Sequence, residues 1–274
     1  MELSGMEMAL FAALLVMTGA VAGVLAGLLG VGGGIVIVPI LFLVFAALDV
    51  PPETSMHVAV ATSLATIIPT SISSARAHQR RGNVDTALLR GWAPWLVLGS
   101  LVGGLLSFVL GGAALRLIFG VIALAVSINM AVPKTLTIAE ALPASKAKQG
   151  GISSLIGGFS ALMGIGGGTL SVPILSAFSY PTHKAVGTAA AFGLLIALPG
   201  VIGFLLSGQG VDGRPPFSFG YVNLVAAALI FPATTLCAPL GARIASALPA
   251  DKLKLVFAAF LGLTALRMLW EVVA

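Results

Sequence analysis

Long apolar tracts with few charged residues run along most of this chain, and they restrict its fold more than any other feature of the sequence. The tracts cover residues 9–47, 57–75, 91–132, 150–179, 184–206 and 219–272, with breaks inside several of them. Only 8% of the residues are charged, whereas a soluble domain carries about 25%. Because a membrane-spanning helix needs roughly 20 apolar residues, the sequence predicts an all-α polytopic membrane protein with about eight to ten crossings.

The start of the chain lacks the pattern of a cleaved signal peptide. Glu2 and Glu7 precede the first tract without any Lys or Arg, whereas a signal peptide begins with a basic region. We therefore expect Leu10 to Leu29 to remain as a helix. The net charge of +5 is explained by Lys and Arg in cytoplasmic loops, so no nucleic-acid partner is expected. The single cysteine, Cys237, excludes an internal disulfide and a cysteine-cluster metal site.

A glycine-rich motif followed by proline occurs twice, once in each half of the chain. The copies are GLLGVGGGIVIVPIL at 27–41 and ALMGIGGGTLSVPIL at 161–175. Aligning 25–41 with 159–175 gives nine identities in 17 positions. Further matches are His57 with His183, Thr62 with Thr188, and LRLIF at 115–119 with LKLVF at 253–257. The chain is therefore predicted to be a duplicated unit.

The duplication predicts a first transmembrane repeat at 1–132, a cytoplasmic linker at 133–149 and a second transmembrane repeat at 150–274. If each repeat crosses five times, with both termini outside, Lys and Arg divide eleven inside to three outside. The eleven are Arg76, Arg80, Arg81, Arg90, Lys134, Lys146, Lys148, Lys184, Arg243, Lys252 and Lys254, and the three are Arg116, Arg214 and Arg267. Four crossings per repeat give nine to five. Since cytoplasmic loops are rich in Lys and Arg, we favour two inverted-topology repeats of about five segments each over parallel repeats.

The glycine triplets predict discontinuous helices. A helix that restarts after such a break directs unpaired N–H groups and a positive dipole end toward the break, and an anion is their natural partner. The alternative is that the glycines serve only close helix packing. A Rossmann or P-loop site is excluded because no βαβ context or Gly-Lys-Ser/Thr accompanies the run. The predicted anion-binding backbone comprises Gly32, Gly33, Gly34 and Ile35 in the first copy, and Gly166, Gly167, Gly168 and Thr169 in the second.

Hydroxyl side chains follow one helix face in the segment HVAVATSLATIIPTSISSAR at 57–76. The stripe consists of Thr62, Thr66, Thr70 and Ser73 or Ser74, with Ser63 beside it. We expect Thr62, Ser63 and the matched Thr188 to complete the anion site. With equal weight, these hydroxyls bond carbonyls of their own helices and serve helix contacts. Arg76 is the basic residue nearest to the stripe and is also predicted to meet the anion.

Two histidines occupy matching positions just before the helices that carry Thr62 and Thr188. Histidine titrates near physiological pH, so His57 and His183 are candidate proton carriers, although a local hydrogen bond or cap is the commoner role at such a boundary. No Asp or Glu falls inside a clear apolar span. Proton coupling through a buried carboxylate therefore has no obvious residue in this sequence.

The two glycine-proline motifs, the loop HQRRGNVD at 78–85, the region GVDGRPPFSFGYVN at 210–223 and the duplicated apolar pattern together resemble the TauE/SafE sulfite exporter family of bacterial membrane transporters. The resemblance covers nearly the whole chain. It implies that the segments 30–39 and 164–173 form the transport core. It further implies a substrate among sulfite, sulfonates and related small organosulfur anions.

We therefore predict a transporter that exports sulfite or a small organosulfonate across the bacterial inner membrane by alternating access. Exit of an anion from a cell that is negative inside is favoured by about 2.3 kcal/mol per charge at 100 mV. The alternatives are a proton-coupled importer of an organosulfonate or, with less support, a cation channel. No enzyme activity and no cofactor or metal is expected. The predicted partners are a small sulfur-containing anion and the lipid bilayer, and a homodimer is compatible with the sequence.

Overall fold

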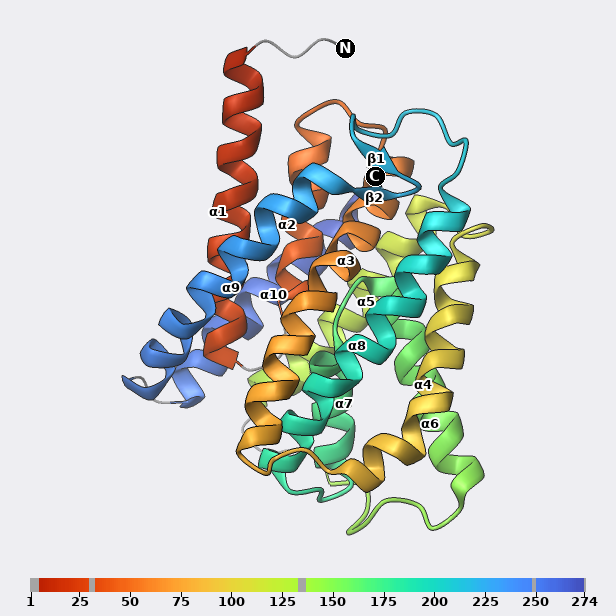
Figure 1. The fold of residues 1–274 in the computed structure, drawn as a ribbon, viewed down its shortest axis with the longest axis vertical. Helices are drawn as coiled ribbons and strands as arrows, with labels where there is room; N and C mark the ends of the chain where they lie inside the picture. Colours follow the sequence, from red (N-terminus) through yellow and green to blue (C-terminus); the bar gives the residue numbers. More distant parts are fainter. Residues whose placement is uncertain (1–4, 30–32, 133–136, 248–249, 274) are drawn as a thin grey trace.

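The computed structural model describes residues 5–29, 33–132, 137–247 and 250–273, and helices make up most of this part of the chain (Figure 1). The first half contains α1 (Gly5–Leu29), α2 (Gly34–Ala46), α3 (Pro52–Arg80), α4 (Thr86–Leu106) and α5 (Gly112–Ala131). The second half contains α6 (Lys146–Met163), α7 (Gly167–Ala177), α8 (Thr182–Ser207), α9 (Leu224–Ala247) and α10 (Ala250–Val273). A hairpin of β1 (Ser218–Phe219) and β2 (Val222–Asn223) connects α8 to α9. The predicted all-α class is confirmed.

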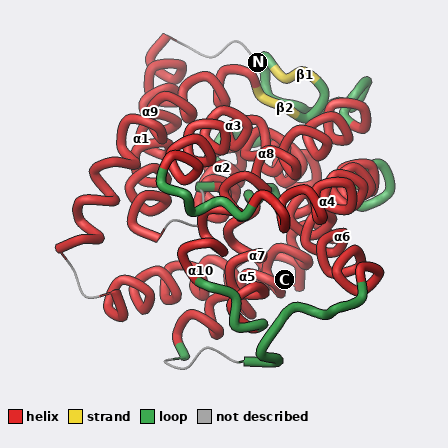
Figure 2. The backbone as a smooth tube through the Cα atoms, turned by 60° about the horizontal axis from the view of Figure 1, so that its bottom comes forward, coloured by secondary structure: helices red, strands yellow, loops and turns green. Residues whose placement is uncertain are grey.

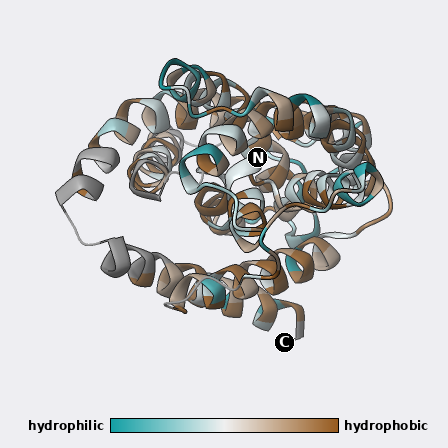
Figure 3. Cartoon of the chain, turned by 90° about the horizontal axis from the view of Figure 1, so that it is seen from below, coloured by the Kyte–Doolittle hydropathy of each residue, from teal (hydrophilic) through white to brown (hydrophobic). Residues whose placement is uncertain are grey.

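Several helices are suited to a membrane. Among the described residues, α3, α4, α5 and α8 are long and apolar enough to cross a bilayer. Shorter apolar helical stretches lie at Ala12–Ala26, Gly34–Ala46, Gly167–Ala177 and Leu224–Leu240. Hydrophobic residues dominate the helices in Figure 3, and many of the hydrophilic ones lie in loops and at helix ends. These features fit a multi-pass membrane protein.

Local sequence explains where several helices begin and end. Asp85 caps α4, because its Oδ1 accepts hydrogen bonds from the N–H groups of Ala87 at 2.9 Å and Leu88 at 3.0 Å. Gly164 ends α6 in the left-handed region, with a φ of 67° that glycine adopts without strain. Lys146 begins α6 inside the predicted linker at 133–149, so the helix starts earlier than the sequence suggested.

Both glycine motifs separate a longer helix from a short one, as the triplets predicted. α1 ends at Leu29 and α2 begins at Gly34, whereas α6 ends at Met163 and α7 begins at Gly167. α2 has 13 residues and α7 has 11. At 1.5 Å per residue these helices are about 20 Å and 17 Å long, less than the roughly 30 Å of a hydrocarbon core. The segments after the motifs are therefore half-length legs.

The contacts between the two halves are reciprocal: the first helix of each half packs against the fourth helix of the other. α1 packs against α9, and α6 packs against α4. The third helices, α3 and α8, also contact one another, as do the fifth helices, α5 and α10. In Figure 1, α1 begins and α10 ends toward the upper end, while the segment 137–145 lies at the lower end. Figure 2 shows the hairpin at the edge of this helical body.

The short helix α2 lies in the centre of the molecule. Its residues from Gly34 to Pro39 are all buried, and Ile35 is part of the main hydrophobic core. An interrupted helix is tolerated at membrane depth only where protein or a water-filled cavity surrounds it. The burial of α2 meets this condition. A second hydrophobic core includes residues of α4 and α8, where the rings of Trp92 and Phe192 stack with centroids 5.7 Å apart.

Candidate functional site

The two glycine motifs meet in the middle of the chain's fold. A Cβ added to Gly34 would lie 2.6 Å from the carbonyl oxygen of Gly164 and 3.0 Å from the Cα of Ile165. A Cβ at Gly164 would in turn lie 2.8 Å from the Cα of Val60 in α3. Ser63, also in α3, donates a hydrogen bond to the carbonyl of Gly164 at 2.7 Å. Glycine therefore allows α2, α3 and the α6–α7 turn to approach closely.

A cavity of about 370 Å³ adjoins both motifs. Gly33 from the first motif and Gly166, Gly167 and Gly168 from the second belong to its lining. The rest of the wall comes from α1, the C-terminal half of α3, α8 and α9, and includes Thr70, Ser71, Ser73, Ser74, His78, Gly193, Thr234 and Thr235. Gly32, a further predicted site residue, lies outside the described residues. The cavity thus reaches from the glycine motifs to the last turns of α3.

Three of the hydroxyls in the cavity wall are already used as donors. Thr70 donates to carbonyls one turn earlier in α3, at 3.0 Å. Thr234 and Thr235 donate in the same way within α9, at 2.8 Å and 2.9 Å. Such hydroxyls present oxygen lone pairs to the cavity. They can accept a hydrogen bond from a ligand but have no hydrogen left to donate.

Other polar groups in the wall keep their donor capacity. The hydroxyls of Ser71, Ser73 and Ser74 have no hydrogen-bond partner among the described residues. The Nδ1 of His78 is buried and also has no partner in the described part of the chain. Gly193 leaves room for Ser71, since a Cβ at this position would overlap the Ser71 hydroxyl. No Asp, Glu, Lys or Arg occurs among the described residues of the lining.

Thr62 and Thr188 lie outside the cavity wall and have matching structural roles. Thr62 Oγ1 accepts a hydrogen bond from the N–H of Asn223 at 3.0 Å, and Thr188 Oγ1 accepts one from the N–H of Asp85 at 2.9 Å. Both threonines are fully buried. Each bond ties the third helix of one half to the residue before the fourth helix of the other. The sequence match between the two threonines therefore reflects equivalent interhelical ties.

A carboxylate and a phenol strengthen the tie at the lower end. The hydroxyl of Tyr180 donates to Asp85 Oδ2. This bond, with a second one from the N–H of Leu88, holds the pKa of the Asp85 carboxyl below its usual range. Burial, with the Asp85 carboxylate beside it, raises the pKa of the Tyr180 phenol. Asn223 stands at the corresponding position of the other tie, where its Oδ1 caps α9 through the N–H of Ala226.

The remaining predicted site residues are scattered. Arg76 lines a neighbouring surface hollow with Arg80, and this hollow shares Ser73 and Ala77 with the cavity. Ile35 is buried in the core, and Thr169 is buried in the first turn of α7. His183 is exposed at the start of α8. His57 is buried in the second turn of α3, away from the half of this helix that lines the cavity.

The structure also brings residues to the cavity that the sequence analysis did not single out. They are Ser71, His78, Gly193, Thr234 and Thr235. The sequence did carry a signal for His78 and for the consecutive residues Thr234 and Thr235 of α9, because polar residues at the end or in the middle of an apolar helix need partners. Ser71 and Gly193 had none, since their meeting depends on how α3 packs against α8.

Comparisons with known proteins agree on a family of membrane proteins. The family described as Sulfite exporter TauE/SafE matches residues 15–268. A probable membrane transporter protein of Haemophilus influenzae is 37% identical over 260 residues, which cover 94% of this chain and 98% of the relative. Similar proteins with the same description occur in Methanocaldococcus jannaschii, 29% identical over 96% of this chain and 97% of the relative, and Bacillus subtilis, 26% identical over 94% and 97%. No solved structure matches the chain.

Proposed function

Because this chain belongs to the TauE/SafE sulfite exporter family, and is a membrane transporter rather than an enzyme, we propose that it moves a small sulfur oxyanion or organosulfonate through the cavity at the glycine motifs. One observation supports this most strongly. Gly33 and Gly166–Gly168, from motifs far apart in sequence, line the same cavity. A packing role alone would not require both motifs to face one open space.

The donors around this cavity suit an anion. Gly167 and Gly168 begin α7 and line the cavity, the first N–H groups of a helix have no acceptor within it, and the dipole of α7 is positive at this end. Ser71, Ser73 and Ser74 can add hydroxyl donors, and His78 can add a ring N–H. The described lining carries no carboxylate that would repel an anion. These groups replace Thr62, Ser63 and Thr188 in the site that we propose.

We further propose that the two halves are inverted-topology repeats. α1 packs against α9 as α6 packs against α4, which fits a two-fold axis, and α1 begins at the upper end of Figure 1 whereas α6 begins toward the lower end, so the axis that we propose lies in the membrane plane. With the linker inside, the lower end of Figure 1 faces the cytoplasm of a bacterial inner membrane, and the cavity reaches this end. Arg76 and Arg80 lie there, in agreement with the excess of positive charge in cytoplasmic loops. Outward transport would then start from the conformation seen here.

Ligand-induced stabilisation of the purified protein tests the proposal. Sulfite, sulfate, taurine, isethionate and chloride are compared by thermal unfolding, since a ligand at 100 times its Kd stabilises by about 2.7 kcal/mol. Ser71→Ala removes one unpartnered hydroxyl and is expected to reduce the anion-induced shift. Gly91→Ala is the matched control, because a Cβ there meets nothing within 4 Å and Gly91 lies outside the cavity. Equal anion responses in both variants, or no response in the wild type, would contradict the proposed site.

A further inference from the structure

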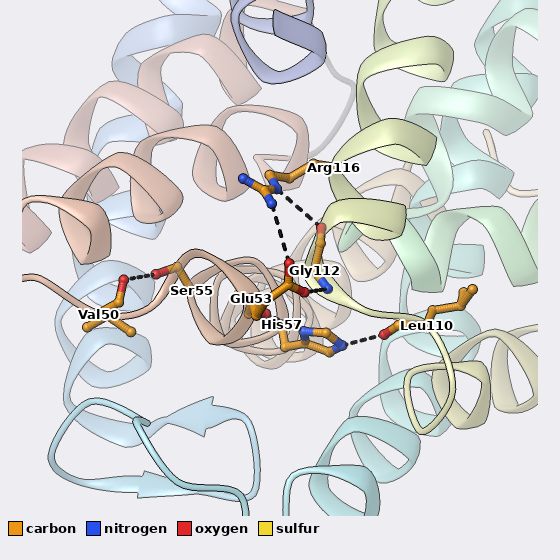
Figure 4. A network of polar contacts seen from close by, with 7 residues as sticks. All are labelled: Val50, Glu53, Ser55, His57, Leu110, Gly112 and Arg116. Carbon is orange, nitrogen blue, oxygen red and sulfur yellow. Dashed lines mark hydrogen bonds and ion pairs between the residues drawn. The ribbon is translucent and has the colours of Figure 1, made fainter. Parts of the chain in front are cut away.

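His57 makes two hydrogen bonds that a neutral ring cannot make together. Its Nδ1 lies 2.7 Å from the carbonyl oxygen of Glu53, and its Nε2 lies 2.9 Å from the carbonyl oxygen of Leu110 (Figure 4). Both partners are acceptors. A neutral imidazole has one N–H donor and one lone pair, whereas the imidazolium has two donors. The neutral ring would therefore place a nitrogen lone pair against an oxygen lone pair at one of the two contacts.

We propose that His57 is a proton-binding site and that its charged form fastens the upper end of the transporter. The site joins three segments. Glu53 lies in the first turn of α3, Leu110 lies in the α4–α5 loop, and the ring of Tyr221, next to β2, stacks on His57 with centroids 4.6 Å apart. His57 is only 4% exposed, so water could not relieve the contact between a nitrogen lone pair of the neutral ring and a carbonyl oxygen.

The described charged groups near His57 are the Glu53 carboxylate and the Arg116 and Arg214 guanidiniums. Glu53 contributes a carboxylate one turn before His57, which offsets the positive end of the α3 dipole. Arg116 of α5 forms an ion pair with this carboxylate at 3.6 Å, and the N–H of Gly112 donates to it as well. The Arg116 guanidinium also lies 5.8 Å from the centre of the Phe42 ring. Arg116 thus compensates the Glu53 carboxylate, and the two carbonyl acceptors are what favour the imidazolium form of His57.

The remaining neighbours of His57 supply aromatic faces and one more cation. α8 contributes the ring of Phe204, with its centroid 6.3 Å from that of His57. Burial raises the pKa of Tyr221, so this phenol stays neutral and acts as a stacking surface. Arg214 lies nearby and donates to the carbonyl of Gly220 at 3.1 Å. A neutral aromatic face stabilises a cation that stacks on it.

Loss of the proton would weaken the upper end selectively. One of the two carbonyls, on α3 or in the α4–α5 loop, would lose its donor, and the stacking on Tyr221 would lose its cationic component. The cavity wall lies in the other half of α3, so the anion-binding groups would not be touched directly. Proton release to the upper side would thus favour opening there. This consequence rests on the proposed transport function, whereas the charge state of His57 does not.

The direct test is ¹⁵N NMR of the histidine rings in nanodiscs. The chain has three histidines, so His78→Gln and His183→Gln assign the His57 signals by elimination without altering His57. We expect both His57 nitrogens to carry protons at pH 7. A singly protonated His57 ring at pH 7 would overturn the proposal. This measurement needs no substrate, and it therefore stands even if no sulfur anion is bound.

Flux measurements in proteoliposomes test the coupling. If one proton moves per anion, one pH unit across the membrane changes the anion accumulation ratio by up to about tenfold. We expect His57→Gln to abolish this dependence while anion exchange at equal pH persists. His183→Gln is the control, since it alters the matching histidine that is exposed at the start of α8. Unchanged pH dependence in His57→Gln, or its loss in His183→Gln, would contradict coupling through His57. Absence of anion flux in the wild type would count against the proposed function instead.

Discussion

Gly166 and Gly167 are neighbours in the second motif, yet alanine at the two positions should have opposite effects. At Gly166 the backbone has φ −76° and ψ −179°, which alanine adopts easily. A Cβ there would lie 3.6 Å and 3.9 Å from side-chain carbons of Ile67, which are ordinary contact distances. At Gly167 the Cβ would overlap the carbonyl oxygen of Ala189 and lie 2.7 Å from the Cβ of Phe192.

These distances set the expected loss of stability in Gly167→Ala. Carbon atoms in contact lie about 3.5–4.0 Å apart, so alanine at Gly167 would push α7 and α8 apart by about 1 Å. Overpacking of this kind costs about 1–3 kcal/mol. At about 2–4 °C per kcal/mol, Gly167→Ala should lower the Tm by roughly 2–12 °C. Gly166→Ala should leave the Tm unchanged or raise it, because alanine lowers the entropy of the unfolded chain and thereby stabilises the fold by about 0.4–1 kcal/mol.

Thermal unfolding in one detergent, with and without the stabilising anion, measures both effects. Gly166→Ala places a methyl group in the cavity wall, so its anion-induced shift should be smaller than that of the wild type although its ligand-free Tm is preserved. Similar loss of ligand-free Tm in both variants would refute the packing argument. A full anion-induced shift in Gly166→Ala would refute the placement of the site.

Two further predictions concern the ties between the halves. Thr62→Val leaves the N–H of Asn223 without its acceptor, and Thr188→Val does the same to the N–H of Asp85. Each variant should lower the free energy of unfolding, measured by chemical denaturation, by about 1–3 kcal/mol. An unchanged free energy of unfolding in either variant would show that water replaces the hydroxyl. Tyr180→Phe removes the main cause of the low pKa of Asp85, so its Tm should fall below that of the wild type at neutral pH. Because a lowered carboxyl pKa stabilises the fold above the unfolded value of about 3.9, this difference should shrink as the pH falls through and below 4, and a difference that stays constant would contradict it.

Much of the fold follows from patterns that are local in the sequence. The apolar tracts have the length of membrane helices, and the glycine-rich motifs interrupt them; in the second motif Gly164, just before the triplet, ends α6 with the positive φ that glycine tolerates. The half-length legs α2 and α7 follow from the same triplets and from the short apolar stretches after them. The inverted arrangement of the repeats stays a prediction, since the sequence supports it only through a difference of a few charges between loops.

The candidate site was harder to predict, because a helix sequence does not reveal which neighbour a polar side chain meets. Thr62 and Ser63 belong to the predicted hydroxyl stripe, but Thr62 binds the N–H of Asn223 and Ser63 binds the carbonyl of Gly164. Both partners lie more than one hundred residues away in sequence. Thr70, from the same stripe, does line the cavity. The hydroxyl stripe correctly indicated a polar face of α3. Which part of this face lines the cavity depends on how the second half of the chain packs against it.

The depth of the cavity also shapes the electric field within the protein. The cavity reaches from the last turns of α3 to the glycine motifs, so water that filled it would carry the potential of the lower compartment inward. In the proposed orientation, the voltage across the membrane would then drop mainly over the packed layer above the motifs, where α2 is buried and Thr62 is tied to Asn223. Under the proposed function, an anion leaving the cavity upward would cross most of the voltage within this layer. A short structural rearrangement of the layer is then enough to move a full elementary charge through the field.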